Sequence, residues 1–161
     1  METTIKVGMA DMQAARHPAV LTTLGLGSCV GIALYDRITG TVGLAHCMLP
    51  DSTQSRNVSN IAKFVDTAIE ALVREMLQLG ANRGRIVAKI AGGAQMFNFS
   101  QSSDLMRIGF RNATAAKEKL EMMRIPLISE DTGGNYGRTI ELDSSTGILL
   151  IKTIGYGLKE I

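Results

Sequence analysis

The chain has 161 residues, of which 45% are apolar, and its 17 basic and 15 acidic side chains give a net charge of +2. This length predicts one domain, residues 1–161, whose core needs neither a disulfide nor a structural metal. A nearly neutral chain with 4% aromatic residues and no tryptophan lacks the basic patch and the stacking platforms of nucleic-acid binding, so nucleic acid is excluded as a partner. The sequence also lacks a signal peptide and the roughly 18-residue apolar run of a membrane span, which predicts a cytoplasmic protein without membrane insertion.

The predicted strands are short apolar or β-branched segments, most of them separated by clusters of Gly, Pro, Asp or Ser. In chain order they are residues 5–9, 19–24, 29–35, 42–48, 86–90, 127–130, 139–142 and 148–152. The segment Asp36-Arg37-Ile38-Thr39-Gly40 joins the third strand to the fourth and is typical of an antiparallel hairpin turn.

Two helices complete the predicted elements. The first has apolar residues at three- and four-residue spacing, with Asn57 or Ser59 as its cap and Gly80 after its end; these apolar residues are Ile61, Val65, Ala68, Ile69, Leu72, Met76 and Leu79. The second helix covers residues 111–124 and ends before Pro126. Because strands and helices do not alternate strictly, we expect an α+β fold, a layered β-sandwich-like sheet with the two main helices packed on it.

The glycine-rich segment at residues 22–31 is the first candidate for a functional site. A dinucleotide-binding fingerprint would need a glycine where Val30 stands and a helix after it, and both are missing. The glycines instead predict a tight turn that presents Cys29 at the start of a strand, with Gly27 and Ser28 as backbone support for an oxyanion hole. The alternative is that Cys29 is a small buried apolar residue, as most free cysteines are.

His46 lies on the strand that should pair with the strand of Cys29 through the predicted hairpin. The two residues are about equally far from the centre of the turn, so the thiol and the imidazole can meet across the strands and activate the cysteine as a nucleophile. The alternative is a core histidine with satisfied hydrogen bonds. Cys47 follows His46 directly, so strand alternation places it on the opposite face, where we expect an inert core thiol and no disulfide to Cys29.

A nucleophile and a base require a third group that orients the imidazole, and Thr23 can supply a hydroxyl or a carbonyl for this task. The alternative is that Thr23 is an ordinary β-branched strand residue. Two cysteines and two histidines without paired spacing predict no metal site, and His17 is expected on the surface. The glycine pairs Gly92-Gly93 and Gly133-Gly134 indicate either close approach to a ligand or plain tight turns.

Together these motifs resemble the CheD family of bacterial chemoreceptor glutamine deamidases over nearly the whole chain. The order and spacing of the motifs carry the resemblance; they are Leu26-Gly27-Ser28-Cys29-Val30, Gly43-Leu44-Ala45-His46 with Leu49-Pro50, Gly92-Gly93-Ala94, Gly109-Phe110-Arg111-Asn112, and Gly133-Gly134 with Gly137-Arg138.

The resemblance implies a fold similar to the catalytic domains of deamidating toxins and a site in which Cys29 is the nucleophile, His46 the base and Thr23 the group that positions the imidazole. It further implies a cysteine-dependent protein-glutamine glutaminase that forms a thioester, uses no cofactor, and acts on glutamines of methyl-accepting chemoreceptors during chemotaxis adaptation. Some members of the family are thought to act on glutamyl methyl esters as well. Many relatives bind the phosphatase CheC, which makes CheC an expected partner.

Two other functions remain open at this point. The chain can be an adaptor that binds CheC or receptors and has weak or secondary catalysis. A cysteine protease or acyltransferase would use the same residues but would need a groove for an extended peptide. An intact pair of Cys29 and His46 favours the enzyme over the adaptor.

Overall fold

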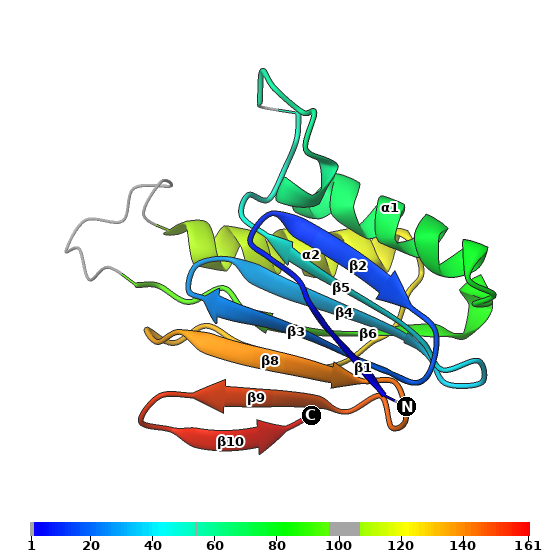
Figure 1. The fold of residues 1–161 in the computed structure, drawn as a ribbon. Coiled ribbons are helices and arrows are strands. Elements are labelled where there is room, and N and C mark those ends of the chain that lie inside the picture. Colours follow the sequence, from blue (N-terminus) through cyan, green and yellow to red (C-terminus); the bar gives the residue numbers. More distant parts are fainter. Residues whose placement is uncertain (1, 54, 97–106) are drawn as a thin grey trace.

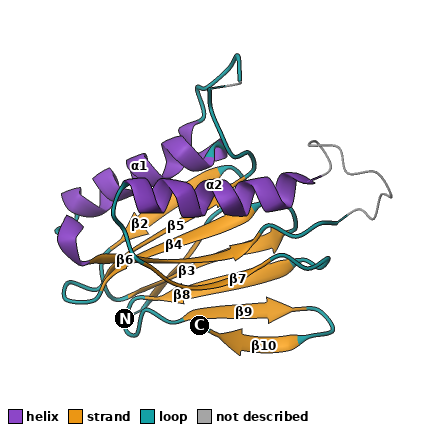
Figure 2. Cartoon of the chain, turned by 180° about the vertical axis from the view of Figure 1, so that it is seen from behind, coloured by secondary structure: helices purple, strands orange, loops and turns teal. Residues whose placement is uncertain are grey.

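The computed structural model of the protein describes residues 2–53, 55–96 and 107–161. These residues form three layers, in which two sheets face each other and two helices cover the free face of one sheet (Figure 1). The view from behind shows both helices on the same side of the sandwich (Figure 2). The predicted α+β class and the layered sandwich with two packed helices are therefore confirmed.

Each sheet has five strands. The outer sheet contains, in spatial order, β1 (Thr3–Lys6), β3 (Ala19–Leu26), β8 (Arg138–Asp143), β9 (Leu149–Thr153) and β10 (Gly157–Glu160). The central sheet, which carries the helices, contains β2 (Asp11–Ala15), β5 (Thr41–Cys47), β4 (Val30–Asp36), β6 (Ile86–Gly92) and β7 (Leu127–Thr132). Most neighbours are antiparallel, whereas β1 with β3 and β6 with β7 are parallel.

The helices are α1 (Val65–Gln78) and α2 (Ile108–Met122), and two 3₁₀ turns, η1 (Ile61–Lys63) and η2 (Arg83–Arg85), lie before α1 and before β6. The predicted cap of the first helix is wrong, because Asn60 accepts the capping hydrogen bond from the amide of Ala62 at the start of η1. Gly80 has a φ of +103° directly after the end of α1, as its predicted role requires.

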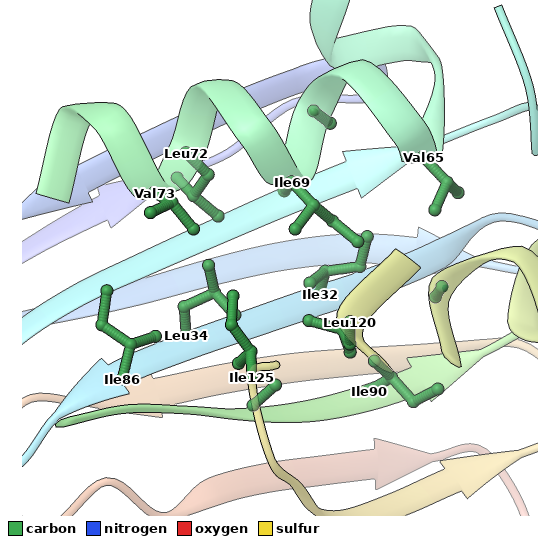
Figure 3. Packing of buried hydrophobic residues seen from close by; sticks show 14 of the residues in the cluster. Ile32, Leu34, Val65, Ile69, Leu72, Val73, Ile86, Ile90, Leu120 and Ile125 are labelled. Atoms are coloured by element: carbon green, nitrogen blue, oxygen red, sulfur yellow. The ribbon is translucent and has the colours of Figure 1, made fainter. Parts of the chain in front are cut away.

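Two apolar cores separate the layers. The helical core lies between the helices and the central sheet (Figure 3), where α1 contributes Val65, Ile69, Leu72 and Val73. The inter-sheet core lies between the two sheets and includes Leu21, Leu44 and Ile140. All residues of β4 and β5 are buried, because these strands face a core on both sides.

The connection from β3 to β4 carries the chain from the outer sheet to the central sheet. A β-bulge interrupts the pairing of β3 with β8 between Thr23 and Leu26, and Gly25 has a φ of +70° in it. Such a bulge bends a strand and re-aims its side chains. Residues 27–29 then form a short bend, so Cys29 lies where the chain passes between the sheets.

Two edge strands, β2 and β10, are absent from the predicted elements. β10 is exposed along its whole length, and β2 is only partly buried. An edge strand that faces a core weakly, or not at all, shows little of the apolar alternation by which strands are predicted.

Candidate functional site

Cys29 and His46 lie on the same side of the central sheet. Cys29 belongs to the inter-sheet core, and the side chain of His46 reaches Thr23 of the outer sheet. The register differs from the predicted one by two residues, because His46 pairs with Gly31 and Val30 pairs with Cys47. Cys29 precedes the strand and lies diagonally from His46, and diagonal positions on paired strands are typically about 7–8 Å apart.

A chain of two hydrogen bonds orients the imidazole of His46. The hydroxyl of Thr23 lies 2.7 Å from His46 Nδ1 and 2.6 Å from the carbonyl oxygen of Val7. A carbonyl only accepts, so the single hydroxyl proton goes to Val7 and the Thr23 oxygen accepts the Nδ1 proton of His46. The neutral imidazole therefore carries its proton on Nδ1 and a free lone pair on Nε2.

The free nitrogen has no partner in the described part of the chain, although His46 is 1% exposed. Buried polar atoms are nearly always hydrogen-bonded, and unpaired ones are found where a group is held ready for a ligand or for catalysis. His46 is therefore not the satisfied core histidine that the sequence left open.

Burial shifts both titratable groups towards their neutral forms. It lowers the pKa of His46, and it raises the pKa of the Cys29 thiol, an effect that the backbone amide of Cys29 partly offsets by hydrogen bonding to its own sulfur. In the free protein these shifts favour a neutral thiol and a neutral imidazole over a thiolate–imidazolium pair.

The three glycine-rich segments lie against one another beside Cys29. The amide of Gly93 donates to the carbonyl of Cys29 at 2.9 Å, and the amide of Gly133 donates to the carbonyl of Gly92 at 3.0 Å. A side chain on Gly92 would place its Cβ 2.4 Å from the carbonyl oxygen of Cys29. The glycines thus allow backbone segments to approach each other closely around the candidate nucleophile.

Gly27 and Ser28, the predicted backbone support, lie in the bend before Cys29. The carbonyl of Gly27 accepts from the amide of Ala94 at 2.9 Å. The amide of Cys29 belongs to the residue that carries the thiol, and it lowers the pKa of that thiol. The amides of Ser28 and Cys29 donate to no backbone carbonyl within the described ranges.

Three further groups near the site make contacts that the sequence did not predict. The carbonyl of Val7 anchors Thr23, and Asn112 of α2 donates to backbone carbonyls beside the site. Arg138, whose side chain is fully buried, binds Asp131 at 3.0 Å and points a second nitrogen at the carbonyl of Gly92, 3.4 Å away. Asn112 and Arg138 each lie in a motif that the sequence analysis singled out, Gly109-Phe110-Arg111-Asn112 and Gly137-Arg138, but the motifs did not specify these contacts.

The remaining cysteine and histidine lie elsewhere. Cys47 is fully buried in the helical core, on the opposite face from Cys29, and both cysteines are free. His17 is exposed, and its Nδ1 lies 2.9 Å from the hydroxyl of Ser144. Among the described residues, no group of three or more His, Cys, Asp and Glu side chains is placed to hold a metal ion.

A cavity of about 440 Å³ is distant from this chemistry. It lies at the hairpin end of β4 and is lined by residues that include Tyr35, Arg37 and Lys89. A second cavity of about 310 Å³ borders Gly93, Phe110 and Gly133, close to the glycine-rich segments.

Comparisons with known proteins agree with the motif resemblance. Residues 48–153 match the family model described as "CheD chemotactic sensory transduction". Probable chemoreceptor glutamine deamidases CheD from Lachnoclostridium phytofermentans and Syntrophomonas wolfei are 58% and 57% identical to this chain, each over 98% of both chains. The protein of the same name from Caldanaerobacter subterraneus is 56% identical over 98% of this chain and 97% of its own length.

A solved structure, of the Bacillus licheniformis hypothetical protein YfiH, aligns with 76% of this chain and 50% of its own with a TM-score of 0.47 and 17% identity. No helix in the described ranges is long and apolar enough to span a membrane. With a family model over more than half of its length and relatives above 50% identity over nearly all of it, this chain belongs to the CheD family.

Proposed function

We propose that this chain is a protein-glutamine deamidase that converts glutamines of methyl-accepting chemoreceptors to glutamate in chemotaxis adaptation. Cys29 is the nucleophile, His46 the general base and Thr23 the residue that positions the imidazole. The observation that carries the proposal is the hydrogen-bond chain from Val7 through Thr23 to His46, because it leaves the Nε2 lone pair free on the side of the sheet that holds Cys29. The relatives are named as chemoreceptor glutamine deamidases, which supports the choice of substrate.

The reaction proceeds in two halves. His46 Nε2 takes the proton from the Cys29 sulfur, which attacks the carboxamide carbon of the substrate glutamine and forms a tetrahedral oxyanion. The imidazolium returns this proton to the amide nitrogen, the carbon–nitrogen bond breaks, ammonia leaves and a thioester remains. Nε2 then removes a proton from water, the resulting hydroxide attacks the thioester, and the Cys29 thiol leaves with the proton held by His46, which releases glutamate.

The pKa shifts determine when the proton moves. Because burial raises the pKa of Cys29 and lowers that of His46, the resting site holds a neutral thiol and a neutral imidazole. Proton transfer therefore accompanies the attack on the substrate, as in general-base catalysis, rather than preceding it. This arrangement limits the reactivity of the thiol when no glutamine is bound.

The amides of Ser28 and Cys29 stabilise the oxyanion. Losing one such donor typically costs about 10²–10³ in kcat. The half-reactions need only a thiol, an imidazole and water, so the mechanism requires no metal or organic cofactor. We further propose that the protein acts in the cytoplasm and that CheC is a partner that controls access to the site.

The test is to incubate the protein with a receptor cytoplasmic fragment and to map glutamine-to-glutamate conversion by mass spectrometry. Cys29→Ala and His46→Ala should abolish conversion. Cys47→Ala is the matched control, since it removes a cysteine from the opposite face of the same sheet and should leave conversion intact.

Full conversion by Cys29→Ala would refute the mechanism. A wild-type protein that binds CheC tightly but converts no glutamine would instead support the adaptor function. Cleavage of the receptor fragment at peptide bonds would identify a cysteine protease.

A further inference from the structure

The bend that carries Cys29 is held by three consecutive carbonyl groups. The carbonyls of Gly27 and Cys29 accept from the amides of Ala94 and Gly93, each at 2.9 Å. The carbonyl between them, that of Ser28, accepts from the side-chain amide of Asn112 on α2, also at 2.9 Å. Asn112 thus supplies a side-chain donor to the bend, whereas the other two donors are backbone amides.

Peptide planarity transmits these contacts to the amides. In a trans peptide the carbonyl of one residue and the N–H of the next point in opposite directions. The Ala94 contact therefore sets the direction of the Ser28 amide, and the Asn112 contact sets that of the Cys29 amide. The Cys29 amide belongs to the residue that carries the thiol, so it is the amide that the Asn112 contact orients next to the nucleophile in the chain.

The chemistry of Asn112 fits a role as a double donor. Its Nδ2 also donates to the carbonyl of Met48 at 3.0 Å, so one amide group links the bend before Cys29 to the segment after His46. Both partners are carbonyls, which can only accept, and this fixes the nitrogen rather than the oxygen at these contacts. Oδ1 has no partner among the described residues, although Asn112 is 0% exposed.

Close packing holds the start of α2 against the site. A Cβ on Gly109 would lie 2.7 Å from the carbonyl oxygen of Gly93, and closer still to that of Ala94. The glycine therefore lets the first turn of the helix rest on the segment whose amides bind Gly27 and Cys29. One helical turn later, Asn112 is held at a fixed distance from the Ser28 carbonyl.

We propose that Asn112 is a positioning residue for the oxyanion hole, acting through the Ser28–Cys29 peptide. The inference rests on the proposed deamidase function, in which an oxyanion forms next to the Cys29 amide. When the Asn112 donors are removed, the peptide is free to rotate, and the Cys29 amide no longer points at the developing charge. The thiol and His46 remain in place, because His46 is oriented by Thr23.

Two reactions of the same sulfur separate this role from a general structural one. Deamidation passes through a tetrahedral oxyanion, whereas alkylation of Cys29 by iodoacetamide is a displacement at a saturated carbon with no oxyanion. The variants are Asn112→Ala and the isosteric Asn112→Asp, which loses the amide donors. Glu118→Ala, an exposed position on the same helix, is the control.

For both variants we expect kcat of deamidation to fall about 10- to 100-fold with KM little changed, since a donor is displaced rather than deleted. The limiting rate of alkylation at high pH, where the sulfur is fully ionised, should stay within about threefold of the wild-type rate, a factor small beside the effect of an oxyanion donor. Thermal unfolding shows which of the two variants are folded. The deamidation and alkylation rates of a folded variant then test the inference.

Equal losses in deamidation and limiting alkylation would overturn the inference, because they would indicate a disordered site. Unchanged kcat in a folded variant would overturn it as well. A wild-type protein that alkylates at Cys29 but deamidates no receptor glutamine would refute the proposed function itself, and this outcome is distinguished by the wild-type measurement alone.

Discussion

Replacing Thr23 with valine tests the hydrogen-bond chain that orients His46. Valine keeps the shape of threonine and removes the hydroxyl, which lies 2.6 Å from the Val7 carbonyl and 2.7 Å from His46 Nδ1. In the variant, the Val7 carbonyl and His46 Nδ1 both lose their hydrogen-bond partner. Val7 and His46 are at most 3% exposed, so water does not replace the lost hydroxyl. The imidazole then loses the contact that keeps its proton on Nδ1.

The expected effects on stability and activity differ in origin. Leaving a buried polar group unpaired costs about 1–3 kcal/mol, so two such groups should lower the free energy of unfolding by about 2–6 kcal/mol. A positioned general base contributes about 10²–10⁴ to the rate. We expect kcat to fall about 100-fold, which corresponds to about 2.7 kcal/mol in the activation barrier.

Steady-state deamidation and denaturant unfolding measure the two effects, and nitrogen NMR of the imidazole reports its tautomer. Thr23→Ser, which keeps the hydroxyl, is the matched control and should retain most of the activity. The reasoning is refuted if Thr23→Val has the wild-type kcat, or if the wild-type spectrum shows the neutral His46 protonated on Nε2.

Three further predictions follow from the contacts of single residues. The kcat/KM for deamidation should rise with pH as His46 loses its proton, with a pKa below the ordinary value of 6.5 because burial lowers it. It should fall as Cys29 ionises, with a pKa above the ordinary value of 9.0 because burial raises it. A rise centred above pH 6.5 would contradict this prediction. Burial alone would raise the pKa of Asp36, but an arginine and backbone amides lower it from 3.8 to about 2. The stabilising effect of Asp36 is therefore present above about pH 4 and is lost as the pH falls through about 2. Asp36→Asn should lower the free energy of unfolding by about 2 kcal/mol at pH 7 and by less in acid, as measured by urea titration. Gly92→Ala should abolish deamidation, since its Cβ would lie 2.4 Å from the Cys29 carbonyl oxygen, whereas Gly8→Ala, which meets no atom within 4 Å, should retain activity in the same assay.

An element can be predicted from the sequence when its buried positions form a regular pattern of apolar residues. The buried face of α1 is predictable because its apolar residues form one stripe along the helix and supply the helical core. The residue that caps the start of the helical segment is not, because Asn57, Ser59 and Asn60 are all chemically suited to cap a turn. The edge strand β10 is exposed throughout and carries no apolar signal.

Within the site, side-chain alternation correctly separated Cys47 from Cys29 and His46, because alternation depends only on position along a strand. The two-residue offset between Cys29 and His46 depends on the hairpin register, which counting from the centre of the turn did not give. Asn112 carried no signal beyond its place in a motif, since a polar helical residue usually faces solvent and its burial arises only when α2 docks.

The placement of the site across two sheets has a consequence for how activity appears during folding. Thr23 belongs to the outer sheet and His46 to the central sheet, so the bond between them joins segments that are paired independently with other strands. A refolding intermediate with the helices docked on the central sheet would show most of its secondary structure and yet lack the oriented base. Recovery of activity should therefore trail recovery of the circular dichroism signal, and it would report the late, long-range step in which the two sheets meet.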